Sequence, residues 1–252
     1  MKAIILSYDK QVGLAQLVVK TYLDLGVKCL DFLVPINHVH TKRKFEFASN
    51  IKCILSKCDI LSSMESTLAQ CDDDEWIYWA IDDRFPTHID LSSFDCIYKA
   101  IDRGDFDFAN GVKLINWREK LTGKKVNVEG MSFSLQESTS MFGFWHHQFL
   151  RAKVLKDTFF TCNEESYNDI RMINNSQHSK KSLSFLENIY VSDRNIVELE
   201  EPLWDGKLTR NGVEALLRFD CSVPEYQVVE SRLGFKDFDE QLKLNPKRPK
   251  FF

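Results

Sequence analysis

The feature of this sequence that most constrains its fold is a run of six apolar residues, 76–81, that stops directly at Asp82 and Asp83. A short, continuous apolar run rich in aromatic and β-branched side chains is typical of a strand that is buried on both faces. Such strands occur in parallel sheets covered by helices on both sides. In open sheets of this kind, ligands bind beyond the carboxyl ends of the strands, which is where Asp82 and Asp83 are expected to lie.

The flanking segments predict the same class of fold. Apolar periodicity and stop signals at Gly26 and Gly104 separate strand-like from helix-like segments. The predicted strands cover residues 2–7, 29–34, 76–81 and 106–115, and the predicted helices cover residues 11–25, 60–68 and 94–101. A repeated strand-helix-strand order predicts an α/β fold with a mostly parallel, Rossmann-type sheet flanked by helices.

The sequence changes character after residue 116. Residues 117–129 are mostly polar and basic, as expected for a surface excursion. Beyond them we predict an extended stretch over residues 132–144, then helices near residues 148–155, 166–173 and 213–217.

Composition excludes several classes of protein. With a formal net charge of -4, the chain lacks the global basic field that favours nucleic acid. The first residues do not resemble a signal peptide, and no run approaches the roughly 18 apolar residues of a membrane helix. The 7 cysteines are scattered without a Cys-x-x-Cys pair, and neither His38 with His40 nor the pair at 146–147 has companion ligands for zinc. We therefore expect a cytoplasmic protein without disulfides or zinc.

The pair Asp82-Asp83 is the strongest candidate for a functional site. Adjacent carboxylates repel each other, and a fold accepts them most readily where a cation, a hydroxyl-bearing ligand or a base offsets the charge. The alternative is that Asp82 caps the following turn while Asp83 is solvated. The acidic run 72–75 follows no apolar strand, so we expect it to be solvated.

Three segments carry a resemblance to a known family. Residues 76–86 (WIYWAIDDRFP) look like the strand and acidic motif of GT-A glycosyltransferases. Residues 144–155 resemble an aromatic and Arg/Leu segment of bacterial enzymes that build surface polysaccharides (capsule, O-antigen, lipopolysaccharide), and residues 206–217 are similar to their closing segment. The resemblance implies a GT-A fold and transfer of a sugar from a nucleotide-sugar donor to a glycan or glycolipid acceptor.

The sequence departs from the family's Asp-x-Asp motif, whose last carboxylate holds a divalent metal that bridges the donor diphosphate. Here the motif reads Asp82-Asp83-Arg84. Asp83 remains a candidate ligand for Mg²⁺ or Mn²⁺, which prefer oxygen ligands. Alternatively, Arg84 pairs with phosphate through its planar guanidinium and reduces the need for a metal.

The resemblance also suggests where donor and acceptor bind. Ser7 and Asp9 follow the first strand and are expected to meet the nucleoside, although Asp9 is equally suited to cap a helix. Trp145, His146 and His147 are expected to form an aromatic, hydrogen-bonding platform for the acceptor sugar, with partial burial at a core edge as the alternative.

If the reaction inverts configuration, which we favour, it needs a general base on the acceptor side. Glu164 and Glu165 open a predicted helix in the second half and are the candidates, with Asp169 in reserve. Their alternative role is to complement the helix dipole.

The expected organisation is one domain with two halves. Residues 1–116 would bind the donor, and residues 117–252 would bind the acceptor and carry a basic tail, 243–252. The tail is a candidate for peripheral contact with the inner face of the membrane, and the alternative is a disordered, solubilising tail. Rival functions are a metal-dependent nucleotidyltransferase, which would need a Gly-rich phosphate loop that is not visible, and a sugar-binding module without turnover.

Overall fold

The computed structural model describes residues 1–116, 121–127, 130, 132–138, 144–160, 187–204, 206–226 and 228–229. Its strands are β1 (Lys2–Leu6), β2 (Asp31–Ile36), β3 (Ile51–Leu55), β4 (Trp76–Ile81), β5 (Phe85–Ile89), β6 (Gly111–Lys113), β7 (Leu121–Val126), β8 (Leu135–Ser138), β9 (Gln148–Arg151), β10 (Ile189–Ser192), β11 (Val197–Glu200), β12 (Leu203–Trp204), β13 (Lys207–Thr209) and β14 (Val228–Val229). Its helices are α1 (Val12–Asp24), α2 (Ile60–Leu68), α3 (Leu91–Asp102), α4 (Ala152–Phe160) and α6 (Arg210–Arg218), with 3-10 helices η1 (Asp9–Gln11) and η2 (Val39–Phe45).

The main sheet has the strand order β3-β2-β1-β4-β9-β6-β10-β8-β7. Neighbours from β3 to β4 are parallel, as are β6 and β10. β9 runs antiparallel between β4 and β6, and β8 runs antiparallel between β10 and β7. All strands of this sheet except β9 and β8 therefore point the same way, which confirms the predicted mostly parallel α/β fold.

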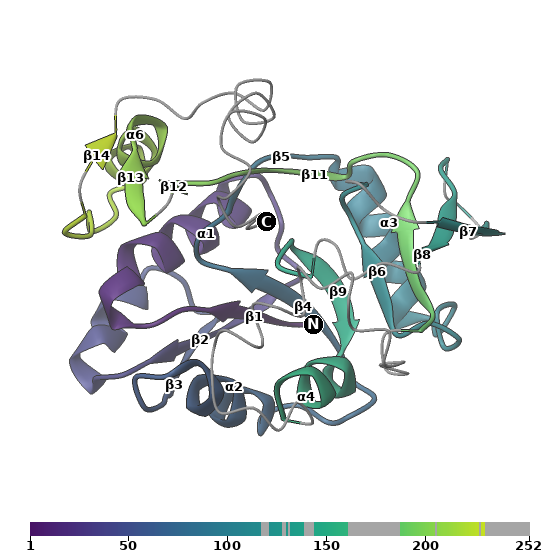
Figure 1. The fold of residues 1–252 in the computed structure, drawn as a ribbon, viewed down its shortest axis with the longest axis horizontal. Helices are drawn as coiled ribbons and strands as arrows, with labels where there is room; N and C mark the ends of the chain where they lie inside the picture. Colours follow the sequence, from purple (N-terminus) through teal and green to yellow (C-terminus); the bar gives the residue numbers. More distant parts are fainter. Residues whose placement is uncertain are drawn as a thin grey trace, which may run out of the picture.

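Helices cover both faces of this sheet, as Figure 1 shows. Side chains alternate along β1, so that Ala3 and Ile5 pack in one apolar layer with α1, and Ile4 and Leu6 pack in the other with α2. α3 joins the first layer and α4 the second. Burying an isoleucine side chain fully contributes about 1.5–3 kcal/mol, so the fully buried Ile4 and Ile5 stabilise both layers.

Local signals set the ends of the helices. α1 and α3 are followed by Gly26 (φ +92°) and Gly104 (φ +82°), in the left-handed region that glycine adopts without strain. At the other ends, Asp59 and Asp90 accept hydrogen bonds from backbone N–H groups of the first turns of α2 and α3. Both glycine stops were predicted.

Other predicted elements are wrong or shifted. Residues 148–151 form strand β9 rather than the start of a helix, and α4 begins only at Ala152. Only Phe149 and Leu150 of β9 are apolar, and so short a segment shows neither a helical nor a strand period; it is a strand because it pairs with β4 and β6. The strand predicted over residues 106–115 is reduced to β6, and β2 begins two residues later than expected. The helix predicted over residues 166–173 lies outside the described residues.

Strands from beyond residue 116 lie within the main sheet. β9 and β10 flank β6, and β11 pairs antiparallel with β5 beside α1 and α3. α6 packs near α1, where the Lys20 ammonium donates to the carbonyl oxygens of Phe219 and Asp220 at 2.7 and 2.9 Å.

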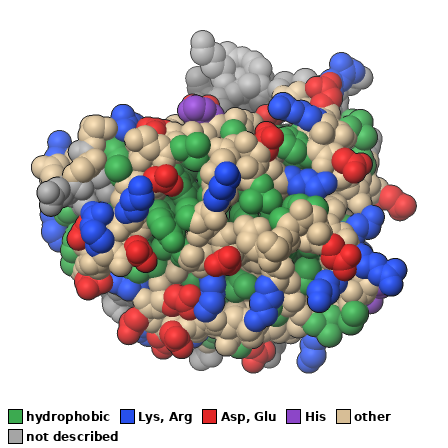
Figure 2. Space-filling view, turned by 180° about the vertical axis from the view of Figure 1, so that it is seen from behind, with side chains coloured by type: hydrophobic (Ala, Val, Ile, Leu, Met, Phe, Trp, Pro, Cys, Tyr) green, Lys and Arg blue, Asp and Glu red, His purple; other side chains and the backbone are tan. Residues whose placement is uncertain are grey.

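The surface in Figure 2 carries basic and acidic side chains interspersed, with apolar side chains between them. None of the described helices has the length and apolar character needed to cross a bilayer. The six cysteines within the described ranges are free thiols.

Candidate functional site

The carboxyl ends of four parallel strands meet at one edge of the sheet. Leu6, the last residue of β1, pairs with Ile81 at the end of β4. Ile36 and Leu55, which end β2 and β3, pair in the same way. The residues that follow these strands therefore lie along a common edge, and Asp82-Asp83 stands at its centre, next to β1.

Asp82 is buried at this edge, with 6% of its surface exposed. The Gln11 side-chain amide is assigned with its nitrogen toward Asp82, because the opposite orientation would place the amide oxygen against the carboxylate oxygens. The amide nitrogen then donates to both carboxylate oxygens, at 2.9 and 3.2 Å. Burial raises the pKa of Asp82 well above its ordinary value, and the charge of Asp83 adds to this, while a hydrogen bond from Ser7 works against it. Ser7 thus contacts Asp82.

Asp83 has a buried carboxylate oxygen, Oδ1, that lacks a hydrogen-bond partner among the described residues. Burial raises its pKa, the neighbouring Arg84 opposes this, and Glu201 adds to it. A buried carboxylate oxygen without a partner is costly, by about 1–3 kcal/mol or more for a charged group, so this atom is suited to receive a ligand.

Arg84 is held by an ion pair with Glu201, in which its Nη2 lies 3.0 Å from Oε1. Both side chains are largely buried, with 14% and 22% of their surfaces exposed. Glu201 directly follows β11, so this pair closes the end of the β5–β11 ribbon. Because Glu201 already compensates the charge of Arg84, the arginine is less available to neutralise a diphosphate alone.

Asp9 fastens the loops after β1 and β2 together. Its Oδ1 accepts from the backbone N–H of Asn37 at 2.7 Å, and its Oδ2 accepts from the Thr41 hydroxyl and pairs with His38 Nδ1, each at 2.7 Å. Burial alone would raise the pKa of Asp9, but these hydrogen bonds hold it below its ordinary value. Both carboxylate oxygens are thus engaged, so Asp9 shapes the edge rather than offering free atoms to a nucleoside.

His147 lies in the core and not on a surface platform, contrary to the expectation. Its Nε2 lies 3.2 Å from the carbonyl oxygen of Ile81, which can only accept, so Nε2 carries the proton. Nδ1 then accepts from the Tyr22 hydroxyl at 2.6 Å, and Tyr22 in turn lies 2.7 Å from the Tyr78 hydroxyl. We call Tyr78, Tyr22 and His147 the buried triad. It leaves His147 no free nitrogen for an acceptor sugar.

His146 and Trp145 keep the intermediate exposure that an acceptor site needs. Burial lowers the pKa of His146 well below its ordinary value, and the charges of Arg84 and Lys113 lower it further, so its imidazole is neutral. Trp145 packs on Phe144 with ring centroids 5.1 Å apart. The charge of Arg84 thus lies close enough to His146 to affect its pKa.

Sequence reasoning missed Gln11, Lys113 and Glu201. Lys113 is the last residue of β6 and is 6% exposed, but it falls inside the strand predicted over residues 106–115, so no charge directly after an apolar strand identified it. Gln11 and Glu201 carry no such signal, because they reach the edge from a 3-10 turn and from a distant strand.

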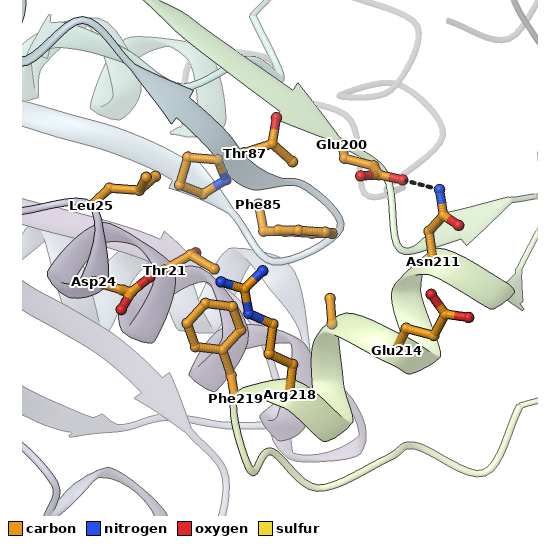
Figure 3. A pocket seen from close by; sticks show the side chains of 12 residues that line it. Thr21, Asp24, Leu25, Phe85, Thr87, Glu200, Asn211, Glu214, Arg218 and Phe219 are labelled. Atoms are coloured by element: carbon orange, nitrogen blue, oxygen red, sulfur yellow. Dashed lines mark hydrogen bonds between the residues drawn. The ribbon is translucent and has the colours of Figure 1, made fainter.

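A hollow of about 350 Å³ lies apart from this edge, between α1, α6 and the β5–β11 ribbon. Figure 3 shows the Arg218 side chain reaching from α6 toward α1 and β5. Its guanidinium carbon lies 5.3 Å from the centre of the Phe219 ring. None of the predicted site residues that the structure describes lines this hollow.

Several predicted residues fall outside the described part of the chain: Glu164, Glu165, Asp169 and the tail, 243–252. Among the described residues, no group of three or more His, Cys, Asp or Glu side chains is arranged to hold a metal ion.

Comparison with known proteins gives only distant likenesses. No protein-family model and no curated protein matches the chain. An active-site mutant of LgtC is similar in structure, with 12% identity, a TM-score of 0.44, and coverage of 89% of this chain and 98% of that one. The 2-C-methyl-D-erythritol 4-phosphate cytidylyltransferase IspD of Francisella tularensis has 13% identity and a TM-score of 0.41, covering 78% and 92%.

The bifunctional IspDF of Campylobacter jejuni has 12% identity and a TM-score of 0.39; the match covers 75% of this chain and 48% of that one. At these TM-scores we infer no function from the three likenesses.

Proposed function

We propose that this protein is a glycosyltransferase that moves a sugar from a nucleotide-sugar donor to a glycan or glycolipid acceptor, in the assembly of surface polysaccharide. The observation that carries the proposal is the unpartnered, buried Oδ1 of Asp83, beside Asp82 at the edge where β1 to β4 end. A divalent cation that accompanies a donor diphosphate would offset negative charge on the two adjacent carboxyl groups.

The residues at this edge fit Mg²⁺ or Mn²⁺ held chiefly by Asp83. Mg²⁺ commonly uses only one or two protein carboxylates and completes its shell with water and substrate phosphates, so the absence of a three-carboxylate cluster among the described residues is compatible with it. When bound, the ion would offset the charge that develops on the departing diphosphate. We place the metal ligand role on Asp83 rather than Asp82, whose oxygens accept from Gln11.

The remaining roles follow from position. We assign Ser7 and Asp82 to the nucleoside side of the donor, Arg84 to the orientation of Asp83, and Asp9 to holding the surrounding loops. Trp145 and His146 would face the acceptor. For an inverting transfer, Glu164 or Glu165 takes the proton of the acceptor hydroxyl as its oxygen bonds to the anomeric carbon, while the bond from that carbon to the diphosphate breaks.

One sequence feature argues against the rival nucleotidyltransferase. That chemistry would call for a Gly-rich loop to cradle phosphates, but the turn between β1 and α1, residues 7–11, contains no glycine. Gly13 follows within α1 and serves packing, because a Cβ there would lie 1.6 Å from the backbone oxygen of Ser222. A sugar-binding module without turnover would bind the donor but not hydrolyse it.

Binding of the donor nucleotide is tested by thermal shift with a panel of nucleotides and nucleotide-sugars, with and without Mn²⁺. A ligand at about a hundred times its Kd stabilises by about 2.7 kcal/mol, a shift in Tm of about 5–10 °C. We expect a Mn²⁺-dependent shift for the wild type and for the control Asp95→Asn, on exposed α3 surface, but not for Asp83→Asn. Equal shifts in all three proteins would contradict the proposed site.

The general base is tested separately. Glu164→Gln and Glu165→Gln should each leave donor binding intact, while one of them lowers kcat by roughly 10²- to 10⁴-fold. If neither lowers kcat by even about tenfold, the base lies elsewhere or the reaction retains configuration.

A further inference from the structure

A group of exposed basic side chains follows β1, β2 and β3 at the edge that carries Asp82-Asp83. We call Lys10, Lys42, Arg43, Lys44 and Lys57 the basic rim; all five are exposed. Lys10 lies in η1 after β1, the next three lie in η2 after β2, and Lys57 follows β3. Because these strands are parallel neighbours, their following loops present the five charges on one side of the molecule.

Hydrogen bonds fix the rim in place. The Asn37 side chain accepts from the backbone N–H of Asp9 at 3.0 Å and donates to the carbonyl oxygen of Lys57 at 3.0 Å, which joins the three loops. Gln16 in α1 donates to the carbonyl oxygen of Lys44 at 2.6 Å. These hydrogen bonds hold the backbone of the three loops in place, so the rim is a preformed surface in the absence of a ligand.

Some basic side chains in the described part of the chain form ion pairs with acidic residues, whereas others, such as Lys28, Lys99 and the basic rim, do not. Elsewhere, Lys156 pairs with Asp73 at 2.6 Å, and Arg151 pairs with Asp107 at 3.2 Å. No ion pair joins a rim side chain to any described residue, and Lys44 donates instead to the hydroxyl of Ser222.

The carboxylates near the basic rim form hydrogen bonds with other groups. Asp9 holds Asn37 and Thr41, and Asp59 accepts from the backbone N–H of Ser62 as the cap of α2. Glu46 follows η2 and is the remaining acidic residue close to the rim in sequence. The rim therefore concentrates positive charge on a chain whose net charge is -4.

An apolar side chain projects among these charges. Val39, the first residue of η2, is 70% exposed; its neighbours in sequence, His38 and His40, have exposed rings that stack on each other with centroids 5.3 Å apart. Cations around an exposed apolar side chain suit a lipid surface, where the charges meet anionic headgroups and the apolar group enters the interface. Exposed rings are also present here, those of His38 and His40 and, just after η2, that of Phe47, so binding of nucleic acid is an outcome that the test below distinguishes.

We propose that the basic rim, together with the exposed Val39 of η2, docks the protein on the surface of an anionic lipid bilayer. The edge that carries Asp82-Asp83 would then face the membrane, where a lipid-linked acceptor is presented. Docking itself does not depend on sugar transfer, so it can be tested without donor or acceptor.

The test uses the full chain and two kinds of vesicle, phosphatidylcholine alone and phosphatidylcholine with phosphatidylserine. Each basic residue near an anionic surface contributes about 1 kcal/mol, so Lys42→Ala/Arg43→Ala should lower the partition coefficient for the anionic vesicles about 30-fold. The matched control is Lys28→Ala/Lys99→Ala, which removes the same charge from exposed positions before β2 and on α3. It should change partitioning less than about threefold, and Val39→Ser should weaken binding without altering its salt dependence.

Three results would overturn the proposal: equal partitioning of the two double variants, wild-type binding to neutral vesicles as tight as to anionic ones, or tighter binding to duplex DNA than to anionic vesicles at the same salt concentration. Neither double variant removes an ion pair or a core contact among the described residues, so unchanged Tm values would show that a loss of binding is not a loss of fold. Since no donor is present, the result is independent of the thermal-shift test of Asp83.

Discussion

The buried triad predicts that two apparently equivalent substitutions will have unequal costs. Tyr22→Phe and Tyr78→Phe each remove one hydroxyl from the core, and both parent residues have no exposed surface. The network has a direction, because His147 Nε2 must donate to the Ile81 carbonyl, which obliges Nδ1 to accept from Tyr22. The Tyr22 oxygen then accepts from Tyr78.

Removing the Tyr22 hydroxyl leaves two buried polar groups without partners, the Tyr78 hydroxyl and His147 Nδ1. At about 1–3 kcal/mol each, Tyr22→Phe should lower the free energy of unfolding by about 2–6 kcal/mol. Tyr78→Phe removes one bond and leaves Tyr22 still donating to His147, so its cost should be about 0.5–1.5 kcal/mol.

Urea unfolding of both variants and the wild type, followed by far-UV circular dichroism, measures these differences from the midpoints at a common m-value. Equal losses, or a larger loss for Tyr78→Phe, would refute the assigned direction of the network.

Two further predictions concern His147 and Asp9. Burial lowers the pKa of His147 to about 3. Between about pH 6.5 and pH 3, His147 is therefore protonated in the unfolded chain and neutral in the folded protein. This residue should therefore lower the free energy of unfolding by up to about 1.4 kcal/mol for each unit by which the pH falls. When that free energy is measured by urea unfolding at several pH values, His147→Gln should show a correspondingly weaker dependence on pH. An equal dependence in both proteins would contradict the buried neutral imidazole. Asp9→Ala should release Asn37 and Thr41 and accelerate hydrogen exchange at the amides of residues 37–44 while sparing α3; unchanged exchange would show that Asp9 does not fasten the loops.

The strand that carries the acidic pair was predictable because its signal is local. Residues 76–81 are apolar without interruption, and all are buried between helices, as β4 is in the structure. The stops at Gly26 and Gly104 were equally local, since glycine adopts a left-handed conformation at both. Local patterns therefore identified the sheet and the edge.

The partners of the acidic pair could not be predicted, because they come from distant segments. The adjacent residues His146 and His147 look alike in sequence, yet His147 turns inward to Tyr22 while His146 lies near Arg84. Which way each ring points depends on the insertion of β9 between β4 and β6, an antiparallel pairing that no local pattern in residues 148–151 indicates. The ion pair of Arg84 with Glu201 likewise depends on β11 returning to β5.

The central claim is that Asp83 anchors the donor for sugar transfer, and the release of nucleoside diphosphate from a panel of nucleotide-sugars tests it most directly. In the presence of Mn²⁺ and a sugar acceptor, the wild type and Asp95→Asn should each turn over at least one donor. Loss of the carboxylate in Asp83→Asn should reduce that turnover by at least about 10²-fold, with the Tm of the protein retained. Near-normal turnover by Asp83→Asn at saturating donor and metal would contradict the account.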